Sequence, residues 1–65
     1  MRARRISWNS AIAMVREATK PLPVAVWAPV WEGLRNHFRG RNTVRRDDFV
    51  DWLNEAIDIA KGRAQ

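Results

Sequence analysis

Residues 46–61 read RDDFVDWLNEAIDIAK, and this stretch decides the fold of the chain. At about 100° per residue, its apolar side chains cover half of a helix circumference and its acidic and amide side chains cover the other half. The apolar half consists of Phe49, Val50, Trp52, Leu53, Ala56, Ile57, Ile59 and Ala60. Asp47 and Asp48 favour the positive end of the helix dipole, and Lys61 favours its negative end. We expect an amphipathic helix that covers a core.

The chain before residue 46 predicts two more helices. From Trp8 to Thr19, apolar side chains recur at helical spacing, and Ser7 is placed to cap the first turn. Residues 20–23 end that helix, because proline has no amide hydrogen and disfavours a helical residue before it. A second apolar stripe follows Pro29, which suits the first position of a helix. We therefore expect the second helix to be broken, or preceded by a short turn, at Pro29.

Together these segments predict the all-α fold class, as one compact three-helix domain that spans residues 1–65. Residues 1–5 are expected to form a basic N-terminal arm, and residues 62–65 a frayed tail. Gly33 lies at the edge of the second stripe, where a missing side chain lets another helix approach closely. The expected core contacts join Phe49, Leu53 and Ala56 of the third helix to Ile12, Val15, Leu34 and Phe38.

The chemistry available to the chain is narrow. It has 65 residues, no cysteine and one histidine, His37, so disulfides and thiolate metal sites are excluded. Nucleophilic catalysis needs a nucleophile, a base and an orienting group in one pocket, and no acid lies at helical spacing beside His37. Three short helices are also expected to leave little room for a pocket of several hundred cubic ångströms. We expect a protein that is not an enzyme and that has no cofactor, metal site or small-molecule substrate.

One pattern imitates a calcium-binding helix–loop–helix, because Val44, Asp48 and Phe49 are spaced like the end of such a loop. The earlier ligand positions would fall on His37, Arg39 and Arg41. Asn42 would occupy the position that requires glycine. Two cations among the ligand positions exclude calcium, so only a structural role remains, in which Val44 is extended and pins the loop to the core.

The strongest functional signal is the distribution of charge. Residues 1–46 carry ten basic groups and two acids, whereas residues 47–65 carry five acids and two basic groups. Clustered arginine is typical of phosphate contacts with DNA or RNA. The candidate nucleic-acid-binding residues are Arg2, Arg4, Arg5, Arg35, Arg39, Arg41, Arg45 and Arg46. An ordinary solvated surface, or a surface that faces a protein, is the alternative interpretation.

The acidic face of the third helix limits the nucleic-acid hypothesis. Carboxylates such as Asp51 and Asp58 would be repelled by phosphates if that helix entered a groove of a duplex. Contacts are therefore expected through the arginines, which position a protein on the backbone and read little sequence. We expect a small regulatory or accessory protein that binds nucleic acid. The cysteine-free chain, which has no long apolar stretch, indicates the cytoplasm and no membrane partner.

The tryptophans support a competing hypothesis. Trp27 lies in a proline-flanked apolar segment, and tryptophan and arginine are enriched at the centres of protein interfaces. The candidate partner-binding residues are Leu22, Val24, Val26 and Trp27. This alternative is a protein-interaction module, an inhibitor or adaptor, that docks a protein partner or a second copy of itself. Small size, arginine richness and the absence of a catalytic motif are typical of accessory proteins of phages and plasmids.

Overall fold

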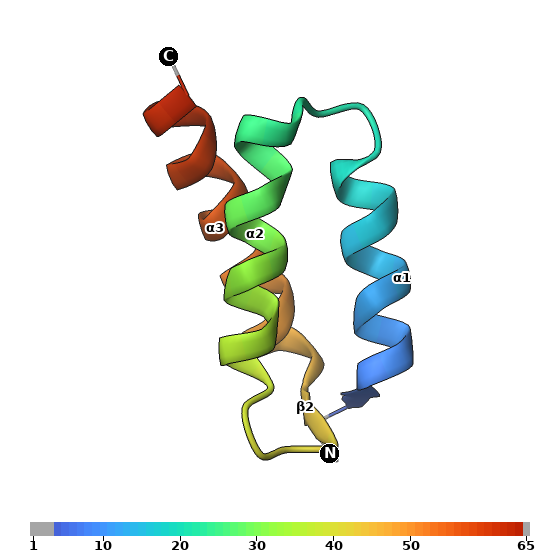
Figure 1. Cartoon of the computed structure of the whole chain (residues 1–65). Helices are drawn as coiled ribbons and strands as arrows, with labels where there is room; N and C mark the ends of the chain where they lie inside the picture. Colours follow the sequence, from blue (N-terminus) through green and yellow to red (C-terminus); the bar gives the residue numbers. More distant parts are fainter. Residues whose placement is uncertain (1–3, 65) are drawn as a thin grey trace.

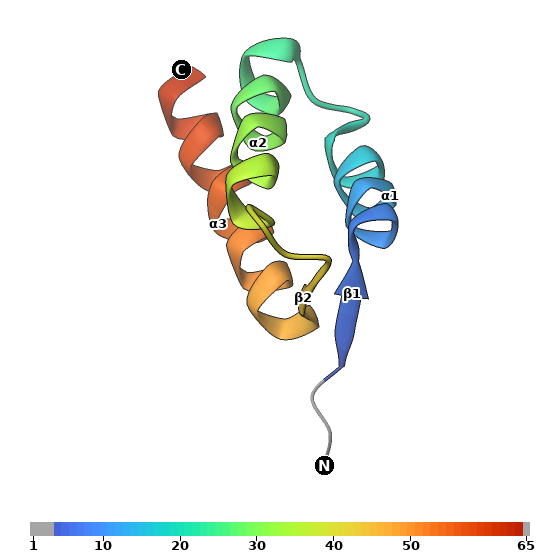
Figure 2. The same ribbon diagram turned by 60° about the horizontal axis from the view of Figure 1, so that its bottom comes forward.

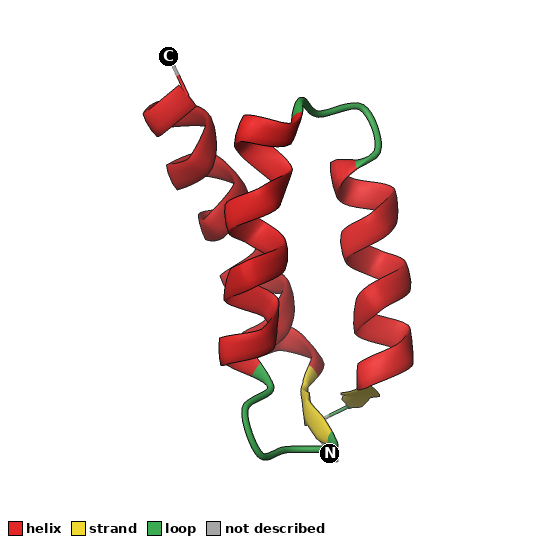
Figure 3. Ribbon diagram, in the orientation of Figure 1, coloured by secondary structure: helices red, strands yellow, loops and turns green. Residues whose placement is uncertain are grey.

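A computed structural model describes residues 4–64 as three helices and one small sheet. The elements in chain order are β1 (Arg5–Ser7), α1 (Trp8–Thr19), α2 (Val24–His37), β2 (Thr43–Arg45) and α3 (Arg46–Ala64). The helices α1 and α2 run antiparallel to each other, and α3 packs against α2 (Figure 1). The molecule is elongated, with extents of 40 × 20 × 19 Å. Helices dominate the fold (Figure 3), which confirms the expected three-helix domain.

The helix α1 begins and ends where its sequence predicts. The Ser7 hydroxyl accepts a hydrogen bond from the Ser10 amide at 3.2 Å, so the expected N-cap is confirmed. At the other end, the buried Thr19 hydroxyl donates to the Val15 carbonyl at 2.7 Å. The Thr19 carbonyl accepts from the Leu22 amide at 2.9 Å, which starts the turn toward α2.

The expected break at Pro29 is wrong, because α2 is continuous across this residue. Pro23 is the N-cap, and its carbonyl accepts the amides of Val26 and Trp27 at 2.9 and 3.1 Å. The helix therefore starts well before Pro29. The buried residues Val26, Val30 and Leu34 lie on both sides of it in one stripe. The proline ring itself is exposed. Core contacts of the buried residues on both sides of it hold the helix together despite the missing hydrogen bond.

The antiparallel sheet of β1 and β2 was not predicted from the sequence. Its register pairs Arg5 with Arg45, Ile6 with Val44, and Ser7 with Thr43. The central pair is buried, so the prediction that Val44 is extended and pins the loop to the core is confirmed. Figure 2 shows the two strands side by side at one end of the molecule. Residues 4 and 5 of the expected arm therefore belong to the folded domain, and residues 1–3 lie outside the described residues.

The core lies where the three helices and the sheet meet. Its largest fully buried side chains are Phe49, Leu34, Val15 and Val30. The expected core residues belong to this cluster or, like Ile12 and Ala56, pack against it, and the rings of Phe38 and Phe49 meet edge to face with centroids 6.0 Å apart. A Cβ atom on Gly33 would lie 3.1 Å from Trp52 Cζ2, so the predicted close approach is also present. The helix α3 continues to Ala64, three residues beyond its expected end, and Gln65 lies outside the described residues.

Candidate nucleic-acid interface

The small sheet joins two arginine clusters that are far apart in the sequence. Arg5 faces Arg45 in the register, and the Arg46 amide donates to the Arg4 carbonyl at 2.8 Å. The loop between α2 and β2 lies at the same end of the molecule (Figure 1). We call this surface the arginine end, and its exposed residues are Arg4, Arg5, Arg39, Arg41, Arg45 and Arg46. Both clusters thus lie at one end of the molecule.

Hydrogen bonds hold one of these guanidinium groups in place. Arg5 Nε donates to Thr43 Oγ1 at 2.9 Å, and Arg5 Nη2 donates to the Thr43 carbonyl at 3.0 Å. A guanidinium has five N–H donors, so others remain for a ligand. Because this side chain is already ordered, it loses less conformational entropy when it binds an anion.

The helix ends add to the positive potential of the arginine end. The helices α1 and α3 both begin there, and a helix N-terminus carries about half a positive charge. The C-terminus of α2 and the side chains of Asp47 and Asp48 oppose this potential. Six arginines outnumber these two aspartates, so the arginine end remains electropositive.

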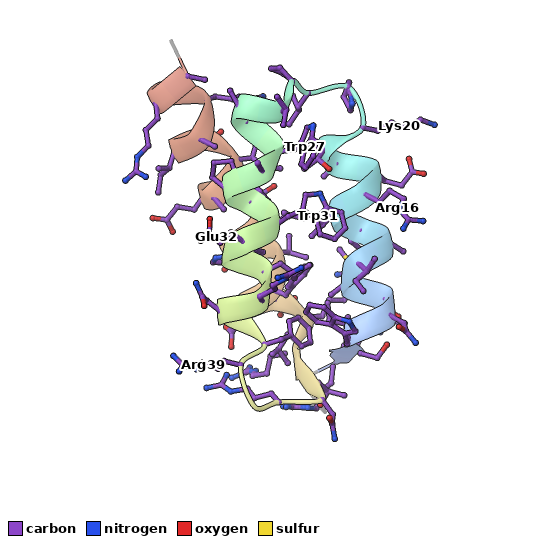
Figure 4. The ribbon with its side chains drawn as sticks, in the orientation of Figure 1. Arg16, Lys20, Trp27, Trp31, Glu32 and Arg39 are labelled. Atoms are coloured by element: carbon purple, nitrogen blue, oxygen red, sulfur yellow. The ribbon has the colours of Figure 1, made fainter. Side chains whose placement is uncertain are left out.

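The other two predicted arginines are Arg2 and Arg35. Arg35 is exposed on α2, one helical turn before Arg39. The Arg39 side chain points away from α1 (Figure 4). Arg2 lies outside the described residues. The structure therefore brings together six of the eight candidate arginines and leaves Arg35 beside them on α2.

His37 lies between the core and the arginine end. Its ring stacks on Trp52 with centroids 4.9 Å apart, and the buried Nε2 atom has no hydrogen-bond partner within residues 4–64. Burial lowers the pKa of His37 below 6.5, Arg41 lowers it further, and Asp48 opposes the shift. A neutral imidazole is therefore favoured at this position, which fits a residue at the boundary of the core.

The four predicted partner-binding residues do not form one exposed surface. Val24 is 60% exposed and Trp27 is 38% exposed. Leu22 is half-buried against the core. Val26 is only 4% exposed, so its assignment to a partner surface is wrong. The continuous α2 helix turns Val26 inward, whereas an irregular segment would have left it free.

A groove between α1 and α2 is lined mostly by residues that were not predicted from the sequence to form a site. It measures about 230 Å³ and is lined by Arg16, Thr19, Lys20, Trp27 and Trp31. Both tryptophans point toward α1 (Figure 4). The spacing of four residues within Arg16/Lys20 and within Trp27/Trp31 places each pair on one helix face. That spacing is visible in the sequence, but the pairing of the two faces depends on the turn between the helices.

Two more grooves lie on the surface, each between two helices. The groove between α1 and α3 measures about 600 Å³, and the one between α2 and α3 about 240 Å³. The expectation of little room for a pocket of several hundred cubic ångströms is therefore wrong for the groove between α1 and α3, which is widely open to solvent. The polar side chains that line the larger groove are those of Glu17 and Asn54.

No known protein family matches the chain, and neither a curated protein nor a solved structure is significantly similar to it. Within residues 4–64, no three metal-ligating side chains are grouped to hold a metal ion. None of the helices in this described range combines the length and the apolar character that a membrane span requires. A functional assignment therefore has to start from the arginine end and the grooves.

Proposed function

We propose that this protein is a non-enzymatic, cytoplasmic regulatory or accessory protein that binds DNA or RNA through the arginine end. The observation that carries the proposal is the β1–β2 pairing, which gathers arginines from residues 4–5 and 39–46 on one surface. The planar guanidinium binds a phosphate through two parallel hydrogen bonds. Several such groups on one surface match the repeating charge of a nucleic-acid backbone.

The acidic side chains of the longest helix, α3, also favour binding through the arginine end. Asp51, Glu55 and Asp58 are exposed on α3, so phosphates would be repelled from that face. Binding through the arginine end keeps these carboxylates away from the backbone. Contacts of this kind fix the position of the protein and read little base sequence.

The test compares two variants that each remove two positive charges. Arg41→Gln/Arg45→Gln changes the arginine end, and Lys61→Gln/Arg63→Gln changes the far end of α3. The first is expected to weaken binding to duplex and single strand alike and to reduce the salt dependence of the affinity. Each lost contact should lower the slope of log K against log salt by about 0.9 for a duplex and about 0.7 for a single strand.

Fluorescence anisotropy at a series of salt concentrations measures both effects. The Lys61/Arg63 variant is the matched control and should keep most of the affinity. Equal losses in both variants would show that net charge, and not the arginine end, drives binding. Failure of the unchanged protein to bind either nucleic acid at low salt would remove the proposal.

A protein-interaction module is the second candidate function. The exposed apolar side chains of Val24 and Trp27 favour it, since they lie one turn of α2 apart and are open to contact. In this candidate an inhibitor or adaptor docks a protein partner, or a second copy, through these side chains. Arginines at the rim would then steer the encounter more than they stabilise the complex.

A further inference from the structure

The groove between α1 and α2 combines aromatic and cationic side chains away from the arginine end. Trp27 and Trp31 lie one turn apart on α2, on the side that faces α1 (Figure 4). Arg16 and Lys20 lie one turn apart on α1 and line the same groove. The turn at residues 20–23 reverses the chain, and this reversal places the last turns of α1 beside the first turns of α2.

Arg16 and Lys20 line this groove from α1. Figure 4 shows their side chains extending from α1 away from α2, toward solvent. Arginine and lysine commonly lay their aliphatic stems against apolar surface and keep the charged group in water. The stems therefore line the groove near the indole rings, and the charged groups lie on its solvent side.

Among the described residues, no carboxylate lines the groove. Glu17 lines the groove on the other side of α1, and Glu32 lies on the side of α2 away from α1. The Thr19 hydroxyl already donates to the Val15 carbonyl and is buried. The charge of the groove is therefore positive, and the remaining surface is aromatic. This combination suits a ligand with a flat ring and a negative group beside it.

Size and chemistry favour a base of a single strand. A volume of about 230 Å³ is below the range of about 300–1,000 Å³ typical of pockets that enclose a small molecule. A planar ring laid against an indole needs no enclosure. In a duplex the faces of the bases are stacked on one another, whereas unpaired bases stack on aromatic side chains and their phosphates follow basic residues.

We propose that this groove receives an unpaired base of single-stranded nucleic acid against Trp27 and Trp31, with the adjoining phosphates at Arg16 and Lys20. The inference rests on the proposed function and names its preferred substrate, a single strand. Arg35 is exposed on α2 one turn after Trp31, on the part of the helix that leads from the groove toward the arginine end.

The experiment compares binding of an oligothymidine and of a mixed-sequence duplex of equal length. Trp27→Ala is expected to weaken oligothymidine binding by about 5-fold to 150-fold, the loss that corresponds to one base–aromatic stack. Duplex affinity should stay unchanged. Trp27→Phe keeps an aromatic face and should retain most of the single-strand affinity. Far-UV circular dichroism verifies that each variant is folded.

A second pair of variants tests the two cations of the groove. Arg16→Gln/Lys20→Gln should weaken oligothymidine binding more than Lys61→Gln/Arg63→Gln, which removes the same charge from the end of α3. Equal effects of the two changes would overturn the assignment of the phosphates to Arg16 and Lys20. Quenching of tryptophan fluorescence by oligothymidine, reduced in Trp27→Ala, is the expected signature of stacking.

The outcomes separate this inference from the proposed function. If Trp27→Ala binds oligothymidine as tightly as the unchanged protein does, the groove assignment fails, whereas loss of duplex binding in the Arg41/Arg45 variant still supports the arginine end. Absence of all binding overturns both. Vesicles of anionic phospholipid form the last arm. Tighter binding to these vesicles than to oligothymidine, lost in Trp27→Ala, would assign the groove to a lipid surface and overturn the inference.

Discussion

His37 is the residue at which the core meets the arginine end. Its ring contacts Phe49 and Trp52 on one side, while Arg41 acts on it from the loop. The unpartnered Nε2 atom is buried, so a proton added to this ring would be poorly solvated. The protonation state of this one side chain is therefore linked to folding.

That link predicts a loss of stability in mild acid. The pKa of His37 is lower in the folded protein than its ordinary value of 6.5, so the unfolded chain binds the proton more tightly. The free energy of unfolding should be highest above about pH 6.5 and should fall as the pH drops below it, toward the pKa of the folded state. His37→Phe keeps an aromatic ring and should flatten this dependence.

Urea unfolding of both proteins between about pH 8 and about pH 5.5 measures the effect, because most carboxyl groups titrate below this range. Parallel curves for the unchanged protein and the variant would contradict the assigned role of His37.

The sequence predicts properties of single residues, but it does not predict which residues lie beside them in the fold. It predicted the close approach at Gly33 from the position of that glycine on the apolar stripe, and the exposure of the arginines from their charge. It assigned no site to Arg16, Lys20 and Trp31, because their meeting depends on how α1 and α2 are placed. It also misjudged Val26, whose burial depends on a helix that runs through Pro29.

Among the helices and strands, α2 differs most clearly from what the local preferences of its residues predict. A proline suits the first position of a helix, yet here it is the sixth residue of one that starts at Val24. Its ring replaces an amide that would donate to the Ala25 carbonyl. Buried residues on either side outweigh this local cost.

Pro29→Ala is therefore expected to stabilise the protein, by up to about 3 kcal/mol, because alanine restores the hydrogen bond and removes the clash of the ring. Pro23→Ala is the matched control, since Pro23 is the N-cap and its replacement restores no bond inside the helix. Thermal unfolding of the variants gives the comparison. A neutral or destabilising effect of Pro29→Ala would indicate a helix that begins at this proline.

The small sheet could not be predicted from local sequence patterns. Each strand has three residues, which is too short for alternation of apolar and polar side chains to stand out. Val44 was recognised because its spacing from Asp48 and Phe49 imitates the end of a calcium-binding loop. Its partner Ile6 lies among arginines at the start of the chain, and only the folded arrangement of α1 and α2 brings the two together.

For the whole molecule, the division of charge was predicted and its geometry was not. The excess of basic groups before residue 47 is visible in the sequence. That six of the arginines occupy one end follows from a pairing between strands almost forty positions apart, which no periodicity reveals. The acidic face of α3 follows directly from helical spacing.

The association state discriminates between the two candidate functions. If Val24 and Trp27 form a surface for a second copy, the protein should self-associate at high concentration, and Trp27→Ala should abolish this association while the helical content is kept. Arg41→Gln/Arg45→Gln should mainly slow the encounter. Sedimentation velocity over a concentration series measures the state. A monomer at every concentration would remove the homodimer from the second candidate function.

The two ends of the described chain lie at opposite poles of the elongated molecule (Figure 1). Arg4 precedes the strand β1 at the arginine end, whereas Ala64 closes α3 at the far pole. An affinity tag or dye joined ahead of Arg4 would therefore crowd the surface that the binding experiments probe. Immobilisation through the C-terminal side, at the other end of the 40 Å axis, leaves the arginine end facing solution.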